Sequence, residues 1–320
     1  MKMNATRDAY GQALIDLGAK NEKVIVMDAD LAAATKTGGF RKAYPDRFYN
    51  AGIAEGNLMS VAGGMATMGY TVFASSFAMF AAGRAFEQIR NTIGYPALNV
   101  KIGATHGGIS VGEDGASHQC NEDIALMHVI PGMTVINPAD YQEAYAAVMA
   151  AAEFDGPVYL RFGRLVLPHL FDESYKFEIG KGVQLREGHD ITIIATGLMV
   201  HEALEAADKL AAEGVNARVI NMATIKPLDV DIVRKAARET GAIVTAEEHS
   251  VIGGLGSAVA EVLAESHPVP VLRVGVEDTF GESGPAKDLL KLYGLSAEKI
   301  FEKAGAALGM KLSLLHNPYP

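Results

Sequence analysis

The chain has 320 residues, of which 49% are hydrophobic and 21% are charged, and its formal net charge is −10. This length suggests two domains, and this composition is typical of a well-packed soluble protein. The acidic balance argues against nucleic acid as the main partner, because binding a phosphate backbone requires a basic face. The single cysteine, Cys120, excludes a disulfide within the chain and fits a reducing cytoplasm. No apolar run is long enough to span a bilayer, and the N-terminal stretch lacks the apolar core of a signal peptide.

Helical periodicity alternates with short apolar runs along the first half of the chain. A helical pattern stops at Gly18, and "KVIVMDAD" follows as a buried parallel strand whose end meets solvent. The same alternation predicts helix Glu55–Met68, strand Thr71–Ser75, helix Phe77–Ile93, strand Asn99–Ala104, helix Glu122–His128, strand Thr134–Asn137, helix Ala139–Glu153 and strand Val158–Arg161.

A stretch without steady period, residues 166–188, separates this series from a second one and is predicted to be a linker. The second series begins with the strand "DITIIATG" and ends with a helix that starts near Ser296, a good N-cap. We therefore predict an α/β fold with two domains, each a mainly parallel sheet with helices on both faces. The predicted limits are residues 1–165 and 189–309, with a peripheral tail at 310–320.

One loop carries an unusual amount of polar chemistry. The sequence from Thr105 to Gln119, "THGGISVGEDGASHQ", holds two histidines, two acids and four glycines directly after a predicted strand. Ligands of open α/β sheets bind beyond the carboxyl ends of the strands. Polar or aromatic residues also follow three other predicted strands: Asp28 and Asp30, Phe77, and Arg161 with Arg164. The sequence therefore predicts a site at this edge of the first sheet.

Three motifs resemble the pyrimidine-binding domain of transketolase: "GIAEGNL" at 52–58, "SSFAMF" at 75–80, and the loop at 105–119 with its spacing of His106, Asp114 and His118. The second half of the chain is similar to the C-terminal transketolase domain. The family's N-terminal domain carries a Gly-Asp-Gly motif that binds Mg²⁺ and the diphosphate of the cofactor, and this sequence contains no Gly-Asp-Gly. The resemblance thus implies the C-terminal subunit of a split transketolase. It would use thiamine diphosphate, with Mg²⁺ bound mainly by a separate N-terminal subunit and no metal ligand of its own.

The resemblance also implies which residues hold the cofactor. Glu55 would be catalytic and share a proton with N1′ of the thiamine aminopyrimidine; from its position alone it is only an acid placed favourably at a helix N-terminus. Phe77 and Phe80 would stack on the pyrimidine, although aromatics at this spacing are more often core residues. Asp30 would lie in the cofactor pocket. The family often adds a tyrosine one turn after Phe80, where this chain has Gly83.

Five residues would bind the substrate by the same resemblance. His106 would contact it toward its phosphate, His118 would lie beside the reacting carbons as a second catalytic residue, and Asp114 would accept a hydrogen bond from a sugar hydroxyl. Arg7 and Arg164 would clamp the terminal phosphate. From the residues alone, the histidines could be ordinary loop residues, Asp114 a turn residue before glycine, and each arginine a surface residue.

A departure from the family pattern concerns the terminal anion. Where the family usually has a phosphate-contacting serine, this chain reads "DLAAATKT", with Ala34 at the expected position and Thr35 as a candidate substitute. The resemblance implies two-carbon ketol transfer between small sugars in the cytoplasm. Pentose phosphates are the default, and other ketose phosphates or a sulfonated sugar use the same chemistry. We expect two copies of each subunit in an α2β2 heterotetramer.

Other functions remain open from the sequence. The β subunit of a 2-oxo acid dehydrogenase has a similar helix start at the position of Glu55, but it does not need the set His106, Asp114 and His118. A 1-deoxyxylulose-phosphate synthase is normally one longer chain. A non-catalytic regulatory half-site is the alternative from a different class. The sequence lacks the glycine fingerprint of a nicotinamide oxidoreductase.

Overall fold

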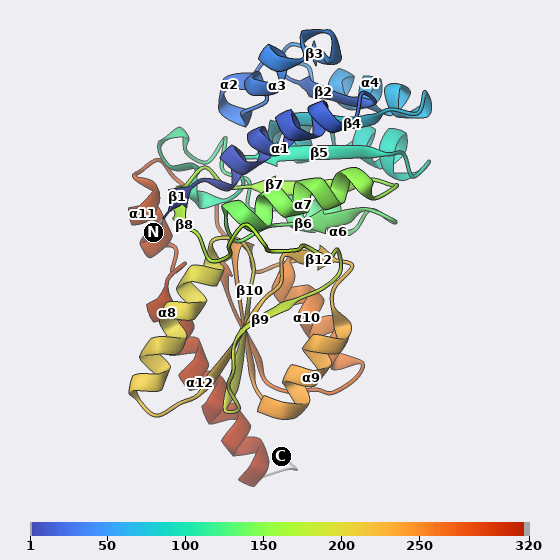
Figure 1. Ribbon diagram of the computed structural model, residues 1–320. Coiled ribbons are helices and arrows are strands. Elements are labelled where there is room, and N and C mark those ends of the chain that lie inside the picture. The colour runs from blue at the N-terminus through green and yellow to red at the C-terminus, as the bar shows by residue number, and fades with distance from the viewer. Residues whose placement is uncertain (1, 317–320) are drawn as a thin grey trace.

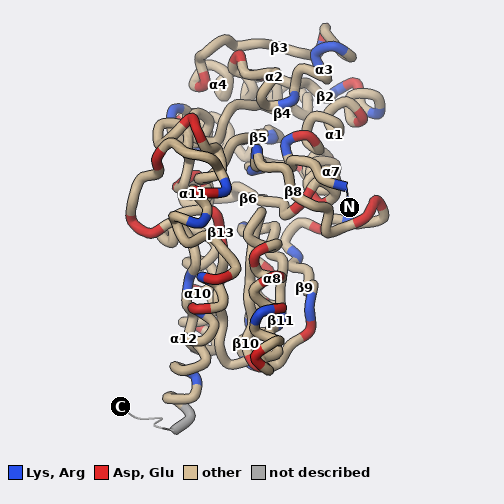
Figure 2. Tube along the Cα trace, turned by 90° about the vertical axis from the view of Figure 1, so that its left-hand side faces the viewer, with Lys and Arg blue, Asp and Glu red and all other residues tan. Residues whose placement is uncertain are grey.

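The computed structural model describes residues 2–316, which form two α/β units joined by an irregular segment (Figure 1). The unit nearer the N-terminus contains a seven-stranded sheet, and the other contains a five-stranded sheet. This arrangement confirms the predicted fold class. Figure 2 shows acidic and basic residues interspersed along the trace of both units. Among the described residues, no helix is long and apolar enough to cross a membrane.

The first sheet has the strand order β12-β6-β7-β5-β4-β2-β3 and is parallel from β6 to β3. The four central strands are buried along their whole length, because helices cover both faces of a parallel sheet. The strand bounds are β2 Val24–Asp28, β3 Phe48–Asn50, β4 Thr71–Phe77, β5 Val100–Thr105, β6 Thr134–Ile136, β7 Val158–Phe162 and β12 Thr224–Lys226.

Alternate strand residues face two separate cores. Val24 and Val26 pack with α1 and α7, whereas Ile25 and Met27 pack with α4, α6 and the turns after β4. The helices of this unit are α1 Thr6–Lys20, α2 Ala32–Thr35, α3 Gly38–Ala43, α4 Glu55–Thr67, α5 Phe86–Gln88, α6 Asp123–His128 and α7 Tyr141–Glu153, with short 3-10 helices at Pro45–Arg47 (η1) and Ile109–Asp114 (η4).

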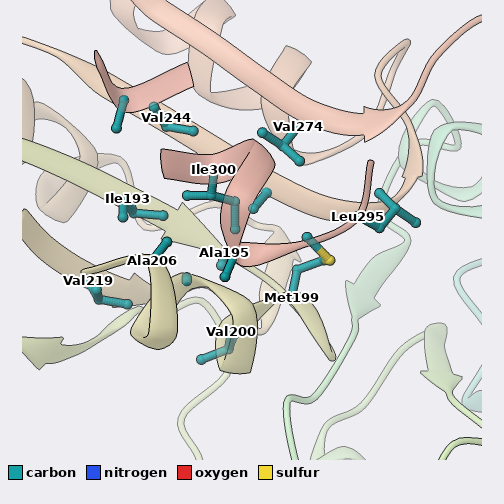
Figure 3. Close-up of a cluster of buried hydrophobic side chains, with 14 of the residues drawn as sticks. Ile193, Ala195, Met199, Val200, Ala206, Val219, Val244, Val274, Leu295 and Ile300 are labelled. Atoms are coloured by element: carbon teal, nitrogen blue, oxygen red, sulfur yellow. The ribbon is translucent and has the colours of Figure 1, made fainter. Parts of the chain in front are cut away.

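The second sheet has the order β14-β13-β10-β11-β9, in which only the edge strand β9 is antiparallel. Helices α8 and α12 cover one face and α9 and α10 the other (Figure 1). Figure 3 shows the first of these cores, to which Val200 of α8, Ile300 of α12, and Ile193 and Val244 of the sheet all belong. The bounds are β9 Val183–Arg186, β10 Ile191–Ala195, β11 Ala217–Asn221, β13 Ile243–Ser250, β14 Val271–Val276, α8 Met199–Ala212, α9 Val230–Thr240, α10 Leu255–Ala264, α11 Ala286–Leu292 and α12 Ala297–His316.

Three elements cross or extend beyond the limits that we predicted for the domains. Strand β9 forms inside the predicted linker, and β12, from the second half of the chain, pairs antiparallel with β6 of the first sheet. Helix α12 continues past residue 309 to His316. The two-residue strands β1 Met3–Asn4 and β8 Leu167–Pro168 pair with each other and tie the N-terminus to the start of the linker. The exact domain limits stay a prediction.

The predicted helix Phe77–Ile93 is broken in the structure. Phe77 ends β4, and the chain then forms the π-helical segments η2 Met79–Arg84 and η3 Ile89–Gly94, with α5 between them. Wide π-helical turns are rare and are found mostly at functional sites. The aromatic residues after β4 therefore leave the sheet on an irregular turn at its carboxyl edge.

Candidate active site

The predicted site residues gather at the carboxyl edge of the first sheet. Strand register places Phe77 beside Thr105 and Thr105 beside Phe162, at the ends of three neighbouring strands. Glu55 begins α4 after a turn in which Gly52 has a φ of 71°, a conformation that favours glycine. The expected convergence of separate strand ends on one edge is thus confirmed by their pairing.

A row of rings runs along this edge. The ring of His106 stacks on Phe77 with 3.8 Å between centroids, and Phe77 stacks on Phe80 at 5.7 Å. The ring of His118 meets Phe80 edge-on at 5.2 Å. Phe77 is buried and Phe80 is half-buried. The row therefore offers a flat apolar wall that joins the region near Glu55 to the region near His106.

Glu55 is a buried carboxylate at one end of this wall. It is only 4% exposed, and Nη1 of Arg84 approaches its Oε1 at 3.5 Å. The guanidinium carbon of Arg84 also lies 4.1 Å from the centroid of the Phe80 ring. Burying a carboxylate is costly unless it is paired or hydrogen-bonded, so this one requires a polar partner at the wall.

His106 is held in one protonation state. Burial lowers its pKa to about 3, and the positive charges of Arg7 and Arg164 add to this effect. Nη1 of Arg7 lies 2.9 Å from Nε2 of His106, and Oγ1 of Thr105 lies 2.8 Å from Nδ1. Because a guanidinium only donates, Nε2 accepts and the proton of the neutral ring is on Nδ1. The backbone φ of His106 is 59°, and such left-handed non-glycine residues concentrate at functional sites.

Three cationic groups lie near His106. Arg7, near the start of α1, also donates to the carbonyl of Ala34 at 3.2 Å. Burial lowers the pKa of Arg7, Asp8 opposes this effect, and Arg164 adds to it, which indicates that the two guanidiniums share one region. Lys36 is close enough to act on His106 and forms an ion pair with Asp8 at 3.2 Å. Positive charges held together in this way suit an anion.

The substitute that we considered for the missing serine does not face this region. Thr35 is fully buried, and its hydroxyl donates to Oδ2 of Asp28 at 2.6 Å. Thr37 donates to the same carboxylate oxygen at 2.9 Å. Thr35 therefore stabilises the turn after β2, and Ala34 offers only its backbone to a ligand.

The remaining predicted residues lie around this centre. Asp30 is exposed, with a φ of 65°, and its Oδ1 accepts a hydrogen bond from Asn50 at 2.8 Å. Asp114 is exposed and lies 3.4 Å from Nη1 of Arg164, which also donates to the carbonyl of Val111. His118 pairs with the hydroxyl of Ser117 through Nδ1. The two parts of the predicted substrate site, Asp114 and Arg164, are thus in direct contact.

Comparison with known proteins identifies the family. The model of the transketolase pyrimidine-binding domain matches residues 2–169, and that of the transketolase C-terminal domain matches residues 180–300. The chain belongs to the transketolase family. It is 52% identical over 300 residues to a putative transketolase C-terminal section of Methanocaldococcus jannaschii, a match that covers 93% of this chain and 94% of that protein.

Two further transketolase relatives are similar over almost their whole length. The 6-deoxy-6-sulfo-D-fructose transketolase subunit SqwH of a Clostridium species is 44% identical over 298 residues, which cover 93% of this chain and 92% of that subunit. The solved structure of a split gene transketolase, described as an inactive beta4 tetramer, has 55% identity and a TM-score of 0.88, with 96% of this chain and 99% of that chain covered. The chain therefore corresponds to the C-terminal section of a split transketolase.

Sequence reasoning missed one residue of the candidate site and misplaced another. Arg84 contacts both Glu55 and Phe80, but it lies 29 residues from Glu55 and no motif pointed to it. Arg161, which lies in β7 three residues before Arg164, does not reach the site. It is 3% exposed, and its Nε donates to Asp123 at 2.8 Å. Its partners place it at the junction of the two units.

A cleft beside the ring wall completes the site. It has a volume of about 630 Å³, and its lining includes Phe80, Gly83 and Arg84 together with the loop around Phe280. Gly83, where a tyrosine is common in transketolases, lines this cleft, and a Cβ at this position would meet the end of the Met79 side chain. Among the described residues, no group of three or more histidine, cysteine or acidic side chains could hold a metal ion.

Proposed function

We propose that this chain is the C-terminal subunit of a transketolase that moves a two-carbon ketol unit from a ketose bearing a terminal anion to an aldose. The observation that carries the proposal is the ring wall between a buried carboxylate, Glu55, and a cationic group formed by Arg7 and Arg164. Such a wall can align an aromatic cofactor and an anionic substrate in one line.

The chain's own residues suit the aminopyrimidine end of thiamine diphosphate. Glu55 supplies a carboxyl group that is shielded from water, and Phe77 and Phe80 supply faces for a flat ring. Asp30 lies in the turn after β2. When bound, thiamine diphosphate supplies the nucleophilic carbon that carries the two-carbon unit. The role of Glu55 is to hold a proton at the pyrimidine N1′.

The substrate groups follow the same line. Arg7 and Arg164 would bind the terminal anion, and Arg7 in turn orients the neutral ring of His106. His118, edge-on to Phe80, would lie beside the reacting carbons. Asp114 would accept a hydrogen bond from a sugar hydroxyl. This bond would replace part of its present contact with Arg164.

The terminal anion is phosphate or sulfonate. The Clostridium relative is named for a sulfonated ketose, and Ala34 removes the hydroxyl that the family usually offers to phosphate. Phosphate carries more charge and accepts more strongly than sulfonate, so a pocket without that hydroxyl weakens phosphate binding more than sulfonate binding. Pentose phosphates and sulfonated ketoses are therefore the first donors to compare.

A partner subunit would complete the site. It would carry the Gly-Asp-Gly motif, bind Mg²⁺ and the diphosphate, and assemble with this chain as an α2β2 heterotetramer. Two observations support the need for a partner subunit. This sequence contains no Gly-Asp-Gly, and the similar split transketolase is described as an inactive beta4 tetramer. The uncharged outer face of α4, formed by Asn57, Ser60, Val61, Gly64 and Thr67, supports a large interface beside Glu55.

The experiment is to purify the chain with its partner and assay transfer from a panel of donors to an aldose phosphate. The panel should contain ketose phosphates, a sulfonated ketose and a 2-oxo acid. We expect ketol transfer by the complex with a ketose donor, and none by this chain alone. Turnover of only the 2-oxo acid would favour a dehydrogenase subunit, and cofactor-saturated complex with no turnover of any donor would favour a regulatory half-site.

A further inference from the structure

Arg84 contacts the two groups that the proposed function assigns to the cofactor. Its Nη1 lies 3.5 Å from Oε1 of Glu55, and its Cζ lies 4.1 Å from the centroid of the Phe80 ring. The guanidinium is flat, donates hydrogen bonds along its edge and stacks on aromatic faces. In these three respects it resembles the aminopyrimidine that would contact the same carboxylate and the same ring.

A second flat group has little room on Phe80. The ring already packs against Phe77 at 5.7 Å and against the edge of His118 at 5.2 Å. Glu55 is 4% exposed, so its carboxylate offers few directions of approach. The guanidinium and the aminopyrimidine therefore compete for one place. We propose that Arg84 occupies the pyrimidine-binding position when no cofactor is bound. It pairs with Glu55 in that state, and it moves away when the pyrimidine binds.

The local structure allows this movement. Arg84 ends the π-helical segment η2, directly follows Gly83, and its side chain is 55% exposed, whereas that of Glu55 is 4% exposed. Arg84 also lines the cleft of about 630 Å³, and the lining of the same cleft includes Glu277 and Asp278. The guanidinium can form an ion pair with these carboxylates after it leaves Glu55, so the positive charge of Arg84 stays paired with a negative one.

Pairing by Arg84 has a physical reason. A buried carboxylate without a partner destabilises the fold or loses its charge. An internal guanidinium satisfies Glu55 without a ligand, and it lowers the apparent affinity for the cofactor because the cofactor must displace it. The inference rests on the proposed function, since it takes Glu55 and Phe80 to be the pyrimidine contacts.

The test measures cofactor binding and not turnover. Thiamine diphosphate with Mg²⁺ is titrated calorimetrically into the complex of this chain with its partner, made with wild type, Arg84→Met or Arg90→Met. Methionine keeps the length of the side chain without its charge or flat face. Arg90 is the matched control, because it lies on η3 of the same irregular stretch, is exposed, and bonds to Asn91.

We expect Arg84→Met to bind the cofactor about tenfold more tightly, the effect of removing one exposed cation–π contact and one partly screened ion pair. Arg90→Met should stay within about twofold of wild type. Unchanged or weaker binding by Arg84→Met overturns the inference, and weaker binding would make Arg84 a cofactor ligand. A wild-type complex that binds no thiamine diphosphate refutes the proposed function itself, which separates the two failures.

A second pair of variants tests where the guanidinium goes. Glu277→Gln combined with Asp278→Asn should weaken cofactor binding about twofold to fivefold when Arg84 is present, and should have no effect in the Arg84→Met background. An equal effect in both backgrounds means that these acids act on the cofactor directly, and this result overturns their role as receivers of Arg84.

Discussion

Replacing Arg161 with methionine should destabilise the whole chain. Arg161 lies near the end of β7 and is 3% exposed, and it connects both units. Its Nε donates to Oδ2 of Asp123 at 2.8 Å, and its Nη2 donates to the carbonyls of Glu248 at 2.9 Å and Cys120 at 3.2 Å. Burial acts to lower the pKa of Arg161, but Asp123 and Glu248 raise it above its ordinary value on balance.

The magnitude follows from what the substitution leaves behind. Methionine fills most of the volume, but Asp123 keeps a buried charge with the hydroxyl of Tyr159 as its remaining donor, and two carbonyls lose a charged donor. Breaking a buried ion pair from one side costs about 3–5 kcal/mol. The free energy of unfolding of a protein is about 5–15 kcal/mol, so this loss is a large part of the total stability.

Urea unfolding followed by circular dichroism measures the loss. The control is Arg186→Met, because Arg186 pairs with Asp208 at the surface and such a pair contributes about 0–1 kcal/mol. Adding Asp123→Asn to Arg161→Met should restore part of the stability by removing the stranded charge. A loss below about 1 kcal/mol for Arg161→Met, or no recovery in the double variant, would refute the reasoning that a buried charge network joins the units.

Four other outcomes follow from the site and the core. Glu55→Gln should lower turnover by about a hundredfold or more in a steady-state assay while the complex still assembles, since an amide cannot share the proton; activity within a few fold of wild type would leave Glu55 a helix-start acid only. Arg164→Ala should raise KM tenfold or more for a phosphorylated acceptor, through loss of about 1.5–3 kcal/mol, and an equal change for the unphosphorylated analogue would contradict an anion contact. Light scattering of the co-expressed subunits should give a heterotetramer, and a monomer that ignores the partner would disprove the shared site. Burial lowers the pKa of His249 from 6.5 to about 4, so the folded protein loses stability as pH falls from 6.5 to 4. In His249→Gln, the slope of the unfolding free energy against pH should be smaller in this range by up to about 1.4 kcal/mol per pH unit. Equal slopes for wild type and variant in chemical denaturation would exclude this effect.

Much of the site could be predicted from local patterns. Parallel strands end at one edge, so residues that follow successive apolar runs must meet there; Phe77 and the loop from Thr105 do so in the structure. The resemblance added Glu55 from a motif, and Arg7 and Arg164 as single positions that match the family. The structure brings each of these next to the ring wall or to His106. The motifs and the sheet topology predict the same location for the site, because both depend on short segments of the chain.

Side-chain partners could not be predicted in the same way. Arg161, near the end of β7, and Arg164, just after that strand, are three residues apart, yet one is buried against Asp123 and the other reaches Asp114. Thr35, which lies beside the position of the missing serine, turns inward to Asp28. Which way each side chain points depends on the path of the loop and on groups that arrive from elsewhere in the chain.

By itself, the sequence determined the alternation of strands and helices, the two parallel sheets and the edge at which the polar residues meet. Periodicity and strand ends are local properties, and burial of apolar faces leaves few ways to arrange them. Only the tertiary structure decided that Arg84 meets Glu55 and Phe80, that Arg161 joins the two units, and that β12 crosses to the first sheet. These contacts join residues far apart in the chain, and hydrogen bonds and ion pairs form only at short range, so no spacing in the sequence encodes them.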